Sequence, residues 1–245
     1  MEEITRFIKE NNEIIKYTIT RKKVKRLNLR IRDGIVKVTT PYHLNEKEII
    51  KFVESKSKWI YENVKKQEKL NKKINIAISD GDVIFHLGEK YKLEIIKNSK
   101  NFVKLDSINK KILIHTKDTE NKEFNKNILE NFQRMEAKTY FNIILKETYK
   151  KIMHLGISYP KMTIRKMKTR WGSCSYYKNR ITINFHLIKQ PIELIELVIL
   201  HELIHFIHPN HSKEFYKIHK ELMPDYKERE SELKKKDVFG GLSYV

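Results

Sequence analysis

The first part of the chain alternates hydrophobic and polar residues as half-buried β-strands do. Apolar residues at positions 27, 29 and 31 are separated by polar ones, so we predict strands within residues 15–41. An Asp-Gly pair at 33–34 is typical of a tight turn, after which residues 35–38 continue as the partner strand. Further strand patterns lie at residues 83–87, 91–96, 102–105 and 112–115.

Other segments show the three-to-four-residue spacing of helices. Residues 45–64 open with Asn and Glu three positions apart, a variant of the capping box, and continue with apolar residues at helical spacing. The Lys-rich stretch 65–73 is expected to be a linker or a fraying helix end. A helix of about 30 residues is predicted from near residue 123 to residue 153, with Gly156 as its C-terminal stop.

These elements predict an α+β protein with two regions that divide near residue 120. Residues 1–120 form a β-rich basic N-terminal region with one helix, and residues 121–245 form a mostly helical region. No internal repeat is apparent in the residues. A chain of 245 residues is long enough to bury a core without disulfides or a structural metal.

The net charge of +20 admits two interpretations. Lys and Arg total 51 against 31 Asp and Glu, and such a surplus creates an attractive field for nucleic acid. Lys is spread over nearly every segment, however, and scattered Lys usually forms a solvated surface. We interpret the basic residues within 21–32 as the solvent face of a sheet rather than as a phosphate-binding hairpin.

Composition excludes several classes of protein. With 40% hydrophobic and 33% charged residues, the chain is too apolar for a disordered protein and too interrupted by charge for a membrane protein. No stretch approaches the roughly 18 apolar residues of a membrane span. We expect no secretory signal, and the single cysteine, Cys174, fits a reducing, cytoplasmic location.

The strongest chemical signal is HELIH at residues 201–205. His201 and His205 lie four positions apart, so on a helix both imidazoles point the same way and can bind one Zn²⁺. Glu202 lies beside them. Zn²⁺ lowers the pKa of bound water, and a neighbouring glutamate can take the proton of that water as general base.

The surroundings of this motif predict a catalytic site. Residues 192–204 are apolar nearly all round the helix, so the helix should be buried. His-Pro-Asn at 208–210 then breaks the helix and lets His211 return as a third ligand. His208 competes with His211 for that role. Three protein ligands with one open position are typical of catalytic zinc.

Other residues have weaker claims. Strands are predicted at 161–168 and 180–185, flanking a turn that contains Arg170 and Cys174. Cys174 is either a further ligand or, preferably, a structural thiol, and Arg170 binds either substrate or a surface partner. His219 is expected to be a packed or surface residue. Candidates for an oxyanion donor are Tyr159, Tyr176, Tyr177 and Tyr216, and candidates for a partner of a zinc histidine are Glu221, Glu228 and Glu230.

Five short motifs together resemble the YgjP-like family of zinc metallopeptidases, relatives of the SprT-like and WLM-type zincins. The motifs are RWGSC at 170–174, ITIN at 181–184, VILHELIH at 198–205, NHSKEF at 210–215 and MPDYK at 223–227. The resemblance implies a zincin-like α+β domain with its HExxH helix beside a small mixed sheet. It also implies that His201, His205 and His211 bind zinc and that Glu202 is the catalytic base.

We therefore expect a cytoplasmic zinc metallopeptidase, a hydrolase that cleaves polypeptides. An exposed edge strand within 161–168 or 180–186 would hold the substrate. Arg170, Tyr216 and His208 are possible contacts of substrate or oxyanion. The alternative is a nucleic-acid-associated protein whose basic N-terminal half binds DNA or RNA, with a zinc site that acts on bound proteins or is purely structural. A zinc hydrolase of a non-peptide amide would carry the same residues.

Overall fold

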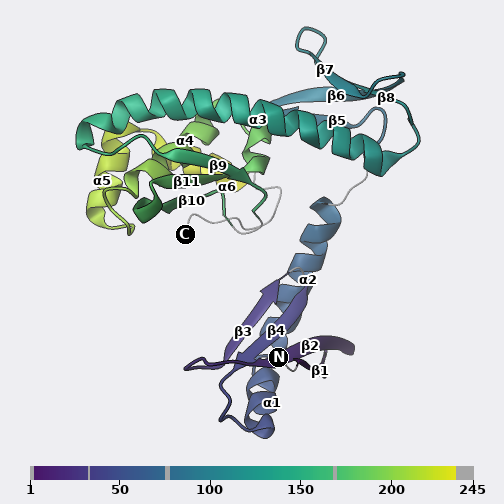
Figure 1. Cartoon of the computed structure of the whole chain (residues 1–245), viewed down its shortest axis with the longest axis vertical. Helices are drawn as coiled ribbons and strands as arrows, with labels where there is room; N and C mark the ends of the chain where they lie inside the picture. The colour runs from purple at the N-terminus through teal and green to yellow at the C-terminus, as the bar shows by residue number, and fades with distance from the viewer. Residues whose placement is uncertain (1–2, 33, 75–77, 168–169, 236–245) are drawn as a thin grey trace. The chain divides into compact units, whose positions relative to one another are not determined.

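The chain folds into two compact units. Figure 1 shows the computed structural model, which describes residues 3–32, 34–74, 78–167 and 170–235. Contacts within the chain are concentrated in unit 1, Met1–Ile76, and unit 2, Ala77–Val245. Each unit is an α+β assembly. Within the described residues, no helix is long and apolar enough to cross a membrane.

A four-stranded sheet forms the centre of unit 1. Its order is β1-β2-β4-β3, with β2 and β4 parallel and the outer pairs antiparallel. The sequence pattern did not predict β1, which pairs with β2 through a turn at Asn11 and Asn12. Both have positive φ, 48° and 62°, the conformation of a type I′ hairpin turn. The strands are β1 (Glu3–Glu10), β2 (Glu13–Arg21), β3 (Asn28–Arg32) and β4 (Ile35–Thr40).

Two helices, α1 (Glu46–Glu54) and α2 (Ser57–Ile74), follow where one was predicted. The capping box at Asn45 and Glu48 is confirmed. The Lys-rich stretch, expected to be a linker or fraying end, is helical. Gln67 holds this part of α2 to the turn between β3 and β4, since its amide donates to the Ile31 carbonyl and accepts from the Gly34 N–H.

The core of unit 1 lies between the sheet and these helices. It contains Ile8, Ile15, Tyr17, Ile19, Val36, Val38, Ile49, Val53, Ile60 and Val64. Leu29 and Ile31 pack against it, whereas Arg30 and Arg32 are exposed. The basic strand therefore has the solvent face that its alternation predicts. Nucleic-acid binding by this region stays a prediction.

Unit 2 begins with a second sheet that repeats the topology of the first. Its order is β5-β6-β8-β7, again with a parallel central pair. Equivalent positions are 76 residues apart: Glu13 and Glu89 begin the second strands, and Thr40 and Thr116 end the fourth. Few residues are identical, so the repeat is visible only in the structure. The strands are β5 (Val83–His86), β6 (Glu89–Lys97), β7 (Phe102–Asp106) and β8 (Lys111–Thr116), as the patterns predicted.

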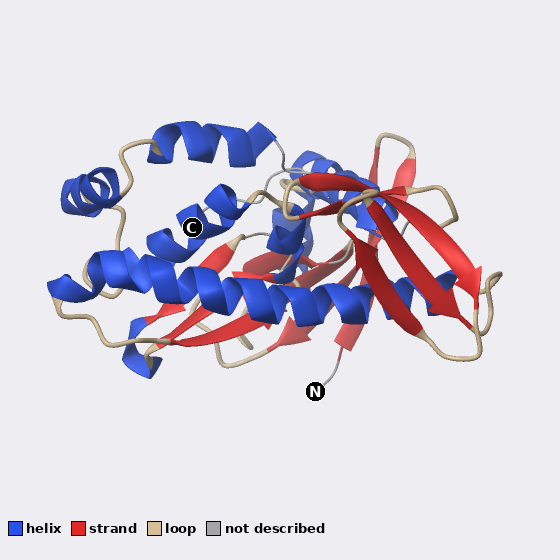
Figure 2. Ribbon diagram, turned by 90° about the horizontal axis from the view of Figure 1, so that it is seen from above, coloured by secondary structure: helices blue, strands red, loops and turns tan. Residues whose placement is uncertain are grey.

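The helix α3 (Lys122–Ile152) connects this sheet to the rest of unit 2 (Figures 1 and 2). Its length matches the prediction, and a short 3₁₀ turn leads to Gly156 at φ +81°. Leu129 is buried against the sheet, with Ile128 and Phe132 packed beside it. The boundary expected near residue 120 thus lies inside unit 2, between a sheet and the helix that covers it.

A small mixed sheet completes the scaffold of the site. Its order is β10-β11-β9, with β11 antiparallel to β10 and parallel to β9. The strands are β9 (Lys161–Arg165), β10 (Gly172–Ser175) and β11 (Arg180–Asn184). The segment expected to be a turn therefore enters a strand, β10, at Gly172. An edge strand was expected within 161–168 or 180–186. β11 is central and paired on both sides, so the expectation for 180–186 is wrong, whereas β9, within 161–168, is an edge strand of this sheet.

Three helices follow: α4 (Ile192–Ile204), α5 (Lys213–Leu222) and α6 (Tyr226–Lys235). α4 packs against α3, α5, α6 and the strands β10 and β11. Beyond its exposed first turn it is buried, as its apolar composition predicts. The expected placement of the helix that carries residues 201–204 beside a small mixed sheet is present.

Candidate active site

Burial of α4 places its polar residues in the interior. His201, Glu202 and His205 are only 2%, 4% and 7% exposed. Burial lowers the pKa of His201 far below its usual range and also lowers that of His205. Both imidazoles are therefore neutral, which is the form that binds a metal.

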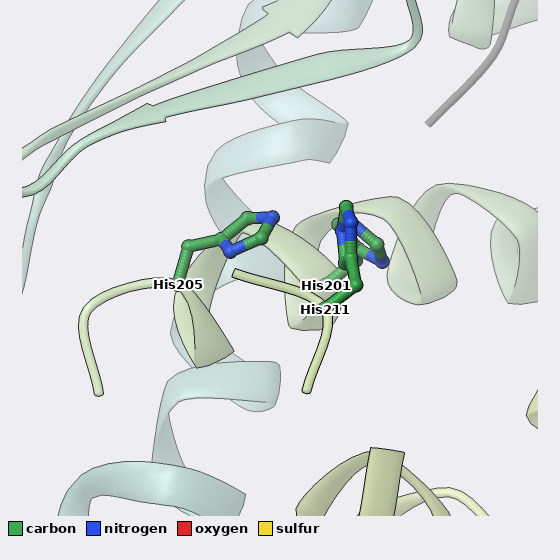
Figure 3. Close-up of side chains that lie close together, drawn as sticks. All are labelled: His201, His205 and His211. Atoms are coloured by element: carbon green, nitrogen blue, oxygen red, sulfur yellow. The ribbon is translucent and has the colours of Figure 1, made fainter. Parts of the chain in front are cut away.

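The chain turns back after α4 and brings His211 to His201 (Figure 3). The His208 N–H donates to the Ile204 carbonyl at 2.9 Å as the helix closes. Nδ1 of His205 then donates to the His208 carbonyl at 3.0 Å, which leaves Nε2 of His205 for a ligand. Nε2 of His211 lies 3.0 Å from Nε2 of His201.

Phe215 forms a floor beneath the three imidazoles. It is fully buried on α5, whose first turn Ser212 caps by accepting from the Phe215 N–H. The ring centroid of Phe215 lies 4.9 Å from that of each histidine, and the histidine centroids are 4.8–4.9 Å apart. This packing fixes the orientation of all three rings. Nothing in the local sequence pattern separated Phe215 from an ordinary core residue.

The three histidines fit a metal ion. Ligand nitrogens of His201, His205 and His211 lie within 4.8 Å of one another. Nε2 of His201 and Nε2 of His211 are close enough for one ring to donate a hydrogen bond to the other, or for both nitrogens to bind one cation. Three converging imidazoles suit a divalent transition metal such as Zn²⁺.

Glu202 lies against the backbone of β10. A Cβ atom at Gly172 would stand 2.7 Å from Cγ and 2.8 Å from Cδ of Glu202, so a side chain at this position would displace the carboxylate. Burial raises the pKa of Glu202 to about 8, while the positive charge of Arg170 acts to lower it. Glycine in the RWGSC motif is therefore explained by the close approach of a residue from α4.

Cys174 has the properties of a structural thiol. Burial, reinforced by the charge of Glu202, raises the pKa of Cys174 to about 12. A thiol with so high a pKa is a poor metal ligand and nucleophile. The possible metal clusters among the described residues do not include it.

Asn184 was not singled out for a role in the site, yet it fixes the strand beside Glu202. It is fully buried at the end of β11. Its side-chain amide donates to the carbonyls of Met167 and Arg170 at 2.8 and 2.9 Å, and its backbone N–H donates to Trp171 at 2.8 Å. These bonds set the path of the chain into Gly172.

The remaining candidates lie at different distances from the site. Arg170 is exposed at the entry to β10, and Tyr216 stacks on His211 with ring centroids 6.1 Å apart. His208 contributes its carbonyl to His205, and the cluster of potential ligands contains His211 rather than His208. Among the glutamates, Glu230 lies close to His201, together with His219.

Comparison with known proteins places these residues in a family. The family model of the YgjP-like metallopeptidase domain matches residues 25–236. A search of curated proteins gave no match.

Solved structures give weaker likenesses. The crystal structure of the metallopeptidase zymogen abylysin of Pyrococcus abyssi is 20% identical, with a TM-score of 0.38 over 42% of this chain and 99% of that one. The zymogen jannalysin of Methanocaldococcus jannaschii is 24% identical, with a TM-score of 0.36 over 40% and 90%. The family match spans most of the chain, and a metallopeptidase is a metal-dependent hydrolase of polypeptides. The chain therefore belongs to the YgjP-like metallopeptidase family.

Proposed function

We propose that the protein is a zinc-dependent metallopeptidase in which His201, His205 and His211 hold the metal and Glu202 is the general base. The observation that carries this proposal is the placement of a buried carboxylate beside three converging imidazoles and against a strand backbone. A purely structural zinc site needs no such carboxylate. Zinc held by three imidazoles supplies Lewis acidity, which polarises a carbonyl group and acidifies water.

Glu202 performs the proton transfers in this scheme. Its carboxylate takes a proton from the attacking water as the oxygen of that water bonds to the scissile carbonyl carbon. The same proton then passes from Glu202 to the amine that leaves when the C–N bond breaks. The absence of a side chain at Gly172 leaves space for this carboxylate, and packing against Phe215 holds the imidazole rings in their orientation. Arg170, Tyr216 and His208 are the side chains from which we expect substrate or oxyanion contacts.

The substrate would bind along β10. The pairing Asn184 N–H to Trp171 carbonyl fixes the alternation of the ladder, so Gly172 and Cys174 turn their backbone groups away from β11. β10 is an edge among the described strands. An extended peptide added there would pair with the backbone of Gly172 and Cys174, in the strand that Glu202 contacts. Of the two segments expected for this role, 180–186 forms the central strand, and 161–168 contains β9 at the opposite edge of the sheet.

Replacing Glu202 tests the mechanism. Glu202→Gln keeps the shape of the side chain but removes the proton acceptor, so we expect about one zinc per chain and a loss of turnover of about 10²–10⁴-fold. Zinc is measured by plasma mass spectrometry, and cleavage with a peptide library. Glu193→Gln, an exposed change on the same helix, is the control. Wild-type cleavage by Glu202→Gln would refute the mechanism, and absence of zinc from the wild type would refute the site.

A further inference from the structure

A second group of polar residues lies behind His201. His219, on α5, is fully buried and stacks on Tyr226, with ring centroids 4.5 Å apart and an interplanar angle of 24°. Its ring stands edge-on to that of His201 at 5.8 Å. A ring nitrogen of His201, a ring nitrogen of His219 and a carboxylate oxygen of Glu230 lie within 4.8 Å of one another.

The chemistry of His219 calls for a partner. His219 is fully buried, and a neutral imidazole carries one N–H donor and one acceptor nitrogen. Neither nitrogen has a hydrogen-bond partner among the described atoms, which is costly in the interior. The Glu230 carboxylate is the charged acceptor within reach. One of its oxygens lies within 4.8 Å of a His219 nitrogen, a gap that a small side-chain rotation or one bridging water would close.

A second metal ion is a poorer explanation of this group. His201 already faces His211 through Nε2, in the direction of the first cluster. An ion placed behind His201 would then keep only His219 and Glu230 as full ligands, too few for a stable protein site. Metal-binding histidines, by contrast, are commonly oriented by a carboxylate or another acceptor behind the ring.

We propose that His219 and Glu230 form a hydrogen-bonded pair that positions His201 and strengthens its hold on the metal. Glu230 accepts from the N–H of His219, and the pair presents negative charge and a fixed dipole to the imidazole of His201. They are positioning residues, since neither touches the substrate. This inference rests on the proposed zinc site.

Metal affinity of the full-length protein tests the pair. Glu230→Gln removes the charge with little change of shape, and His219→Phe keeps the aromatic stack but removes both nitrogens. We expect each variant to raise the zinc dissociation constant about 10–100-fold, measured by competition with a chromogenic chelator. The double variant should be no weaker than the weaker single variant, because both changes break one pair.

Matched controls separate positioning from general damage. Glu228→Gln makes the same charge change at an exposed position of α6, and Lys234→Gln removes the 3.9 Å surface ion pair of Glu230. Both should bind zinc as the wild type does. Thermal unfolding of the metal-free variants should match that of the metal-free wild type. The visible absorption of the Co²⁺-loaded protein should change in His219→Phe and Glu230→Gln only.

Each contrary result points to a different failure. A wild type without zinc would overturn the proposed function together with this inference. A wild type with one zinc and unchanged affinity in both variants would overturn the pair alone. Two zinc ions per wild-type chain, with one lost in Glu230→Gln, would show a second metal site instead.

Discussion

The two four-stranded sheets have the same order and pairing, but only the second supports the candidate site. The turn of the first hairpin, Asn11 and Asn12, is exposed. The equivalent turn of the second hairpin is docked: Leu87 N–H donates to the Ile188 carbonyl at 2.7 Å, and Gly88 N–H to the Lys189 carbonyl at 3.3 Å. These acceptors directly precede α4.

The helices that follow the two sheets also differ in which elements they pack against. In unit 1 the helix is interrupted after Glu54, and the two pieces, α1 and α2, cover their own sheet. In unit 2, α3 continues for 31 residues, so its first half covers the sheet and its second half packs on α4. The same sheet topology thus forms a separate unit with its own core at the N-terminus, and in unit 2 it supports the helix that packs on α4.

Truncation should give the largest contrast between the repeats. Removing residues 1–76 takes away one complete unit, so unit 2 should fold and bind zinc. Removing residues 1–120 strips the second sheet from α3 and exposes Leu129 and its neighbours, so we expect that fragment to aggregate or stay unfolded. Circular dichroism and metal content compare the two fragments. Equal folding of both would favour the division near residue 120.

Truncating a buried side chain should lower the free energy of unfolding of the unit that contains it, by about 2–5 kcal/mol for isoleucine to alanine. Val38 and Ile114 are equivalent and fully buried. We expect Ile114→Ala to destabilise unit 2, and Val38→Ala to destabilise unit 1 by a smaller amount because fewer atoms are lost. The two tryptophans, Trp59 and Trp171, lie in different units. In a Trp59→Phe background, fluorescence of Trp171 should report a lower unfolding midpoint for Ile114→Ala alone.

The hairpin turns should respond unequally to alanine. Asn12 and Gly88 both have positive φ, but Asn12 already carries a Cβ, so alanine costs about 1–2 kcal/mol at Gly88 and less at Asn12. At Gly88 the new Cβ would also stand 2.9 Å from the Pro191 backbone, which adds about 1–3 kcal/mol of overpacking. Gly88→Ala should also weaken zinc binding, since Pro191 is the N-cap of α4. Identical unfolding curves for the two variants would show that the docked turn is not a support of the site.

Helix caps should give the smallest effect. The side chains of Asn45 and Asn121 both accept from a backbone N–H three residues further along the chain. Of the two, only Asn45 also donates its own backbone N–H to the residue three positions on, the Glu48 carboxylate, at 3.0 Å. We expect losses of about 1 kcal/mol for either alanine variant, somewhat larger at Asn45. Urea denaturation measures both. A larger loss at Asn121 would mean that its helix depends on the cap for more than its first turn.

The sequence predicted elements whose signals are local. Alternation of apolar and polar residues predicted the seven strands β2 to β8, and helical spacing predicted α3 and α4. β1 was missed because its turn is Asn-Asn rather than a glycine pair. β10 was interpreted as a turn because its glycine and small polar residues suit both structures.

The site was predictable only in part for the same reason. The four-residue spacing of His201 and His205 predicts that they share one face of a helix, and the structure brings His211 to them. The floor under the rings, Phe215, and the buried His219 depend on how α5 packs against α4. Such contacts join residues that no local period links, so they appear only when the chain is folded.

The contact between Gly172 and Glu202 has a consequence for anyone who would move this site to another protein. The HExxH helix does not carry its function alone, because its carboxylate occupies space that a neighbouring strand must leave empty. A host scaffold would have to supply a strand bare of side chain at that point, held by an anchor such as Asn184. The transplantable part is therefore a helix and a strand together, 30 residues apart in the chain.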